Sequence, residues 1–172
     1  MIINVLTGLA GAAFGVTDED SAAKFASATS VACLAAFWAV SIASFAAELT
    51  RCHQLGIPAV VSHPGNYLDE REAGLERNAR AYAEALRAAP GEVMVLLETT
   101  AGTGTALGSR FEELAELRAR ISPELRHRIG YCADTCHLYS AGYDLVDAYD
   151  AVWEEWERLI GIEHLHCFHL ND

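Results

Sequence analysis

The stretch Val-Met-Val-Leu-Leu-Glu at residues 93–98 decides the fold class of this chain. Five consecutive apolar residues predict a strand that is buried on both faces, which is typical of parallel sheets covered by helices. Similar short apolar runs occur at residues 59–61, 129–133 and 165–170. Segments with helical periodicity lie between these runs, and strands that alternate with helices pair in parallel through right-handed crossovers. The sequence therefore predicts an α/β fold.

The helical segments are identified by apolar residues at intervals of three and four. Residues 75–86 show this pattern between the first two strands. Ser109 and Glu112 have the spacing of a capping box, and residues 111–121 supply the apolar stripe of the helix that would follow it. A further helix is expected over residues 149–160, before the last strand.

Residues 25–47 form an uncharged run that is long enough to cross a bilayer, so a membrane anchor is one interpretation. The run contains four serines and a threonine, and its second half continues past the charged residues as an amphipathic helix. These features favour a helix of a soluble protein. Its expected apolar face consists of Ile42, Phe45, Leu49, Cys52 and Leu55.

Composition and charge limit the function classes. The 172 residues are 52% hydrophobic and 21% charged, as in ordinary globular domains. The 24 acidic and 12 basic residues give a net charge of −12, which counts against nucleic-acid binding unless acidic residues hold metal ions.

The five cysteines have no disulfide spacing, which indicates a reducing cytoplasm. Cys132 and Cys136 could form a metal pair, but no second pair follows, so we expect buried free thiols.

Residues with metal-binding side chains follow the predicted strands in order: His63, Glu98, Asp134 and His169. The intervals between them are 35, 36 and 35 residues, so each strand and helix unit delivers one such side chain to the same edge of the sheet. Two imidazoles and two carboxylates suit zinc or manganese. The sequence therefore predicts a metal site at the carboxyl ends of the strands.

Each of these residues also has a simpler interpretation. A histidine in a turn, or an aspartate that caps a loop, is more common than a metal ligand. Glu98 is the strongest candidate, because a carboxylate that closes an apolar strand is buried at high cost unless it is paired or bound to a metal. His137 lies three residues after Asp134 and could serve a neighbouring metal, although a loop histidine bonded to backbone fits its spacing equally well.

Four segments of the chain carry a family resemblance. They are SHPGNYL at 62–68, LLETTAGTGTALGSRFEEL at 96–114, RIGYCADTCHLYSAGYDL at 128–145 and FHLND at 168–172. In these blocks the chain resembles the endonuclease IV family of zinc-dependent apurinic/apyrimidinic endonucleases. The resemblance implies a (β/α) TIM-type barrel, here an incomplete barrel of about four parallel strands with flanking helices. We therefore expect a partial barrel with a metal site at residues 38–172 and an irregular or helical segment at residues 1–37.

The resemblance also implies an activity. Family members repair DNA by cleaving the phosphodiester 5′ to abasic sites in the double strand with zinc-activated water, and they hold up to three zinc ions. For this chain we expect fewer ions, with manganese as an alternative, a cytoplasmic location, no stable protein partner and no membrane contact. His63 resembles a ligand of the first zinc, and Glu98 resembles the catalytic carboxylate that bridges the first and second zinc ions. Asp134 and His169 resemble ligands of the second zinc. His137 resembles a ligand of the third.

The chain also departs from the family pattern. No histidine precedes His53, so an early histidine ligand has no counterpart, and the family's later ligands would follow the final HLND. Thr99 stands where the family has asparagine, and Tyr67 where histidine is common. Two alternatives stay open: a metal-dependent sugar isomerase or epimerase of the same barrel type, and a catalytically inactive fragment, with residues 25–47 as an anchor. Open sheet edges predict marginal stability or self-association.

Overall fold

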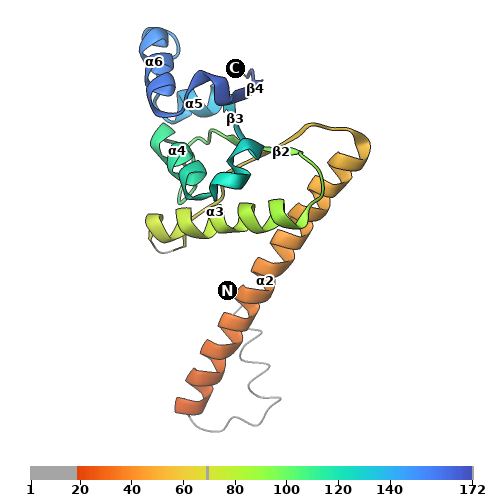
Figure 1. The fold of residues 1–172 in the computed structure, drawn as a ribbon. Coiled ribbons are helices and arrows are strands. Elements are labelled where there is room, and N and C mark those ends of the chain that lie inside the picture. Colours follow the sequence, from red (N-terminus) through yellow and green to blue (C-terminus); the bar gives the residue numbers. More distant parts are fainter. Residues whose placement is uncertain (1–18, 69, 172) are drawn as a thin grey trace. The chain divides into compact units, whose positions relative to one another are not determined.

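The computed structural model describes residues 19–68 and 70–171, with side chains from residue 36 onward. The chain divides into two units, Met1–Ser44 and Phe45–Asp172. In the first unit, the described residues belong to helix α2, which begins at Glu19 and ends at Leu55 in the second unit. The second unit contains the last part of α2 and the other helices and strands of the described residues (Figure 1).

Strands and helices alternate in the second unit, as the sequence predicts. Each apolar run forms a short strand, and each periodic segment forms a helix. In chain order the elements are β1 (Ala59–Ser62), α3 (Arg71–Ala88), β2 (Met94–Glu98), α4 (Phe111–Arg120), β3 (Ile129–Asp134), α5 (Thr135–Ser140), α6 (Tyr149–Leu159) and β4 (Leu165–His169). Short 3-10 helices precede β3 and β4, at Pro123–Arg128 and Ile162–His164.

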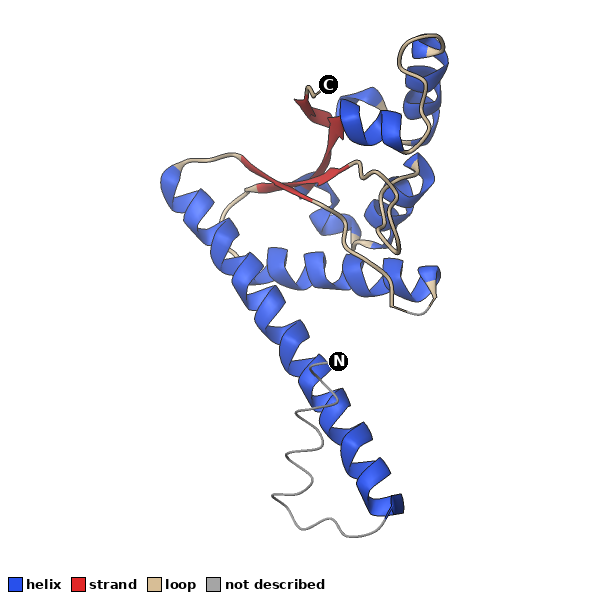
Figure 2. Ribbon diagram, turned by 180° about the vertical axis from the view of Figure 1, so that it is seen from behind, coloured by secondary structure: helices blue, strands red, loops and turns tan. Residues whose placement is uncertain are grey.

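The four strands form one parallel sheet in the order β1-β2-β3-β4, drawn in red in Figure 2. Helices α3, α4 and α6 connect successive strands, and α4 contacts both α3 and α6. This arrangement confirms the predicted α/β fold with about four parallel strands and flanking helices. One irregularity occurs between β3 and β4: Tyr131 pairs with Leu165, whereas Cys132 pairs with Cys167. His166 is therefore an extra residue in β4, as in a β-bulge.

The two faces of the sheet have different neighbours, because side chains alternate between the faces along each strand. Val95, Leu97 and Tyr131 are buried on the face that the helices cover. Tyr131 packs against Trp156 of α6, with ring centroids 5.9 Å apart. The opposite face, which we call the site face, carries Leu96, Glu98, Cys132 and Asp134.

The core lies between the covered face of the sheet and helices α4 and α6. Trp156 is completely buried and meets the ring of Phe111 edge-on, with centroids 5.0 Å apart. Phe111 in turn stacks on Tyr143 at 4.1 Å. Burial of large aromatic side chains is among the main driving forces of folding, so these contacts fix α4 and α6 against β3.

The last part of α2 contributes to the second unit through the predicted apolar face. Leu49 and Cys52 are buried, as expected. The prediction is wrong for Leu55, which is 73% exposed because the helix ends there and the chain turns at Gly56 with a φ of 71°. None of the helices in the described residues is both long enough and apolar enough to span a bilayer.

The predicted capping box at Ser109 and Glu112 is also wrong. The N-cap position of α4 falls on Arg110, one residue later than the box requires, and no side chain caps the helix. Glu113, rather than Glu112, reaches back toward the loop, where its Oε2 accepts the backbone N–H of Gly108 at 2.8 Å. The acidic side chain therefore fixes the loop before the helix instead of the first turn.

The glycine-rich loop between β2 and α4 packs against the segment that follows β1. The backbone N–H of Leu107 donates to the carbonyl of Gly65 at 2.9 Å. Gly108 has a φ of 92°, and a Cβ at this position would lie 2.6 Å from Pro64 Cγ, so the close approach requires glycine. These contacts hold His63, the residue before Pro64, beside the end of β2.

Candidate metal centre

The five predicted site residues meet at the sheet edge where the parallel strands end. Glu98, Asp134 and His169 are the last residues of β2, β3 and β4, and His63 directly follows β1. His137 joins them from the first turns of α5. The β3–β4 register places Asp134 beside His169. The even spacing of these residues along the sequence thus becomes proximity in space.

Glu98 lies at the centre of the group. Its side chain is 9% exposed, and its two oxygens face different histidines. Oε2 is 3.2 Å from His63 Nε2, whereas Oε1 is 2.7 Å from His169 Nδ1. Oε1 also lies 3.7 Å from His137 Nδ1. In this position a single carboxylate can bind a different ion through each oxygen.

Asp134 positions its neighbours by capping helix α5. Its Oδ1 accepts the backbone N–H of His137 at 2.9 Å, which fixes the first turn of the helix directly after the strand. Its Oδ2 accepts a hydrogen bond from the Asn171 side chain and lies 3.7 Å from His169 Nδ1. The capped turn brings the ring of His137 edge-on to that of His63, with centroids 5.3 Å apart.

Thr99 is a site residue to which the sequence reasoning gave no role. It follows Glu98 and is 1% exposed. Its Oγ1 accepts the backbone N–H of Asp134 at 2.9 Å, and its carbonyl oxygen lies 2.8 Å from His137 Nδ1. When Nδ1 donates to this carbonyl, Nε2 of His137 is left as the ligand atom. The sequence signals were its position next to Glu98 and the departure from the family's asparagine.

The side chains form two overlapping groups that share Glu98. One group is His63, Glu98 and His137, and the other is Glu98, Asp134 and His169; within each, one ligand atom per residue lies within 4.8 Å of the others. Among the described residues, the side chains that lie within ion-pair distance of Glu98 and Asp134 are those of histidines. Buried carboxylates need compensating positive charge, so the donor set fits zinc or manganese. The other described histidines, His53, His127, His164 and His166, belong to neither group.

The expectation of buried free thiols is confirmed for Cys132 and wrong for Cys136. Cys132 is buried and free, but Cys136 is exposed because it lies on the first turn of the short surface helix α5. Cys33 lies outside the described side chains. Cys132 faces Cys167 across the β3–β4 pairing, and burial raises the pKa of the Cys132 thiol. A hydrogen bond with Cys167 and the negative charge of Glu98 shift this pKa in the same direction.

Comparison with known proteins defines the class. Residues 34–172 match the family described as "Xylose isomerase-like TIM barrel", and the chain belongs to this family. A probable endonuclease 4 from Chloroflexus aggregans is 52% identical over 136 residues, which cover 77% of this chain and 47% of that protein. Another, from Geobacter sulfurreducens, is 45% identical over 136 residues, covering 77% and 45%. The crystal structure of endonuclease IV from Thermus thermophilus matches with a TM-score of 0.66 and 38% identity, covering 77% of this chain and 45% of that chain.

These findings confirm the resemblance to endonuclease IV and the TIM-barrel type of the fold. The chain spans about half the length of the curated relatives that it matches. Its described residues contain four parallel strands, which form an incomplete barrel.

Proposed function

We propose that this chain provides part of the active site of a zinc-dependent DNA repair endonuclease, which cleaves the phosphodiester 5′ to abasic sites. The observation that carries the proposal is the position of Glu98, buried between His63 and His169 with one oxygen toward each. The five residues of the two groups that share Glu98, which we call the cluster, lie at the carboxyl ends of the strands. This is where (β/α) barrels place their active sites. The names of the relatives, probable endonuclease 4 and endonuclease IV, support the same activity.

In this proposal each cluster residue has a distinct role. His63 and His137 would hold metal on one side of Glu98, Asp134 and His169 would hold metal on the other, and Glu98 would serve both sides as the catalytic carboxylate. Zinc, when bound, lowers the pKa of water to about 7 and so provides a nucleophile near neutral pH. The chain keeps the ligands in fixed positions through the Asp134 cap on α5 and the hydrogen bonds that Thr99 accepts.

The proposed substrate is double-stranded DNA with an abasic site. A net charge of −12 repels the phosphate backbone, so binding requires local positive charge. Metal ions in the carboxylate and histidine cluster supply that charge where the phosphate must approach. We further propose that manganese can replace zinc, and that the protein acts in the cytoplasm without a stable protein partner.

A sugar isomerase or epimerase of the same barrel type is less well supported. Such enzymes place carboxylates and histidines around one divalent ion at equivalent strand ends. Here two ligand groups share Glu98 instead of one. His63 and His137 form the additional group, which a site for a single ion does not need. The relatives that match are named as endonucleases.

A combined measurement of metal content and DNA cleavage tests the proposal. We expect the zinc-loaded chain to bind at least one zinc ion and to cut a duplex that contains one abasic analogue on the 5′ side of the analogue. Loss of a residue that merely supports a metal ligand costs about 10–100-fold, so Glu98→Gln, which alters a ligand, should lower zinc affinity and cleavage by about 100-fold or more.

Glu154→Gln is the matched control, because Glu154 makes the same change in charge at an exposed position on α6. It should leave both measurements unchanged. Binding of less than one zinc ion by the unaltered chain, together with no cleavage, would leave the inactive-fragment interpretation in place. Equal zinc affinity in the unaltered chain and in Glu98→Gln would exclude Glu98 as a ligand.

A further inference from the structure

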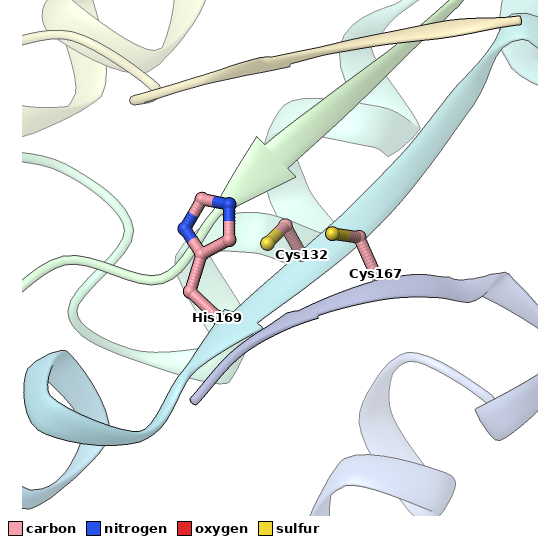
Figure 3. A group of neighbouring side chains, drawn as sticks. All are labelled: Cys132, Cys167 and His169. Carbon is pink, nitrogen blue, oxygen red and sulfur yellow. The ribbon is translucent and has the colours of Figure 1, made fainter. Parts of the chain in front are cut away.

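The site face carries a third group of potential ligands, Cys132, Cys167 and His169, which Figure 3 shows as sticks. Cys132 pairs with Cys167 on one side and with Glu98 on the other. Neighbouring strands lie about 4.8 Å apart, and paired residues point to the same face. His169 follows Cys167 by two residues, so it shares that face. Cys132 therefore lies beside Glu98, and Cys167 lies one strand further along, two residues before His169.

The distances within this group suit a single ion. One ligand atom from each of the three residues lies within 4.8 Å of the others. Ligand atoms about 2.3 Å from a tetrahedral ion are roughly 3.8 Å apart, so small side-chain rotations are sufficient. Cys132 is 0% exposed, whereas the side chain of His169 is 41% exposed. The group is therefore shielded from one side and accessible to an ion from the other.

The donor atoms differ in kind from those of the carboxylate and histidine cluster. Two sulfurs and one imidazole are a soft set, which prefers copper(I), cadmium(II) and zinc over magnesium, calcium or manganese. The geometry points to a thiolate site for a soft cation of the copper(I) or cadmium(II) class, formed by Cys132, Cys167 and His169 beneath the proposed zinc centre.

Sharing of His169 links the two sites. His169 Nδ1 lies 2.7 Å from Glu98 Oε1, and the same residue completes both the thiolate group and the group with Asp134. When a soft ion binds the imidazole of His169, this histidine is no longer available as a ligand in the group with Glu98 and Asp134. Occupation of the thiolate site therefore weakens the proposed metal centre, and this link rests on the proposed function of that centre.

Cadmium titration of the metal-free, reduced chain tests the thiolate site directly. We expect a sulfur-to-cadmium absorption band that saturates at one ion per chain. Cys167→Ser removes one of the two sulfurs, so it should lose about half of the band and weaken cadmium binding by at least about tenfold. Cys136→Ser changes an exposed thiol outside the group and should behave like the unaltered chain.

The outcomes separate the thiolate site from nonspecific thiol chemistry. A full band in Cys167→Ser, or its loss in Cys136→Ser, overturns the proposal. If the circular dichroism spectrum shows that Cys167→Ser does not fold, Cys167→Ala replaces it, because alanine keeps an apolar side chain on β4. The readout is metal binding alone, so absence of nuclease activity does not affect it.

Manganese tests the link through His169, since it binds carboxylates and imidazole but not thiols. One equivalent of cadmium should lower the manganese affinity of the unaltered chain at least about tenfold and have much less effect in Cys167→Ser. An equal effect of cadmium in both proteins would show that it competes directly at the carboxylates, and it would overturn the link while leaving the thiolate site intact.

Discussion

At the scale of single residues, the site consists of buried carboxylates whose charges are matched by histidines and, for Asp134, by the backbone N–H of His137. Glu98 is 7% exposed and Asp134 is 3% exposed. Burial of a charged carboxylate destabilises the fold unless the charge has a partner. The hydrogen bonds around the site therefore matter as much for its stability as the ligands do. Thr99 holds two of the ligand residues in place, because its Oγ1 accepts the backbone N–H of Asp134 and its carbonyl oxygen lies 2.8 Å from His137 Nδ1. It belongs to neither ligand group, so its contribution can be measured separately.

Thr99→Val removes the Oγ1 acceptor while it preserves the shape of the side chain and the carbonyl that faces His137. The backbone N–H of Asp134 then lacks its partner in a buried position, which costs about 1–3 kcal/mol. We expect the free energy of unfolding in urea to fall by that amount, and zinc affinity to fall with it. Thr103→Val, an exposed change in the same loop, should shift the free energy of unfolding by less than about 0.5 kcal/mol. Equal stability of the two variants would contradict this role.

His63, Glu98, Asp134 and His169 could be predicted from the sequence because the end of each strand is visible as the end of an apolar run. His137 lies on α5, so its spacing from Asp134 alone left its role open. The role of Thr99 and the contact between Cys132 and Cys167 could not. Both depend on which residues of neighbouring strands lie side by side, across separations of about 35 residues. The register of β4 also contains the extra His166, which no feature of the local sequence indicates.

At the scale of elements, periodicity predicted the four strands and the helices between them. It did not predict α5, because a helix of six residues is too short to show an apolar period. The predicted capping box failed because the loop before α4 delays the N-cap to Arg110, and the glutamate that reaches back is Glu113. Local motifs were therefore less informative than the long apolar patterns.

Helix α4 offers a direct test of how these elements are held together. Leu114 is 0% exposed in the layer between α4 and the sheet, so Leu114→Ala should leave a cavity and lower the free energy of unfolding by about 2–5 kcal/mol. The control is Leu68→Ala, at a position that is 75% exposed, where the change should be below about 0.5 kcal/mol. Chemical denaturation gives both values. A small effect at Leu114 would mean that α4 does not pack as described.

At the scale of the whole chain, the sheet is open. Its order makes β1 and β4 the edge strands of the described residues, and edge strands with exposed apolar neighbours promote association. A groove of about 760 Å³ lies beside β4, and aromatic and aliphatic side chains form most of its surface. Its apolar lining includes Tyr139, Tyr149, Trp153, Phe168 and Leu170.

We expect the isolated chain to self-associate as its concentration rises, because no element among residues 19–68 and 70–171 pairs with the outer edge of β4. Leu170 is 80% exposed in the groove, and Leu170→Lys should shift the equilibrium toward monomer by placing a charge there. Leu68→Lys, at a similarly exposed position away from the groove, should leave association unchanged. Sedimentation at several concentrations measures both. A monomer at every concentration, with a sharp thermal transition, would show that the open edge is tolerated.

The extra residue in β4 has a consequence for how such a site can be gained or lost. Before His166, β4 follows the inside-outside alternation set by the pairing of Tyr131 with Leu165, and that alternation alone would turn His169 toward the helices and Phe168 toward the carboxylates. The insertion reverses the phase of the last three residues. Loss of the bulge without loss of a residue would therefore place the phenyl ring of Phe168 at the cluster instead of the imidazole of His169, whereas deletion of His166 would straighten the strand and keep His169 beside Asp134.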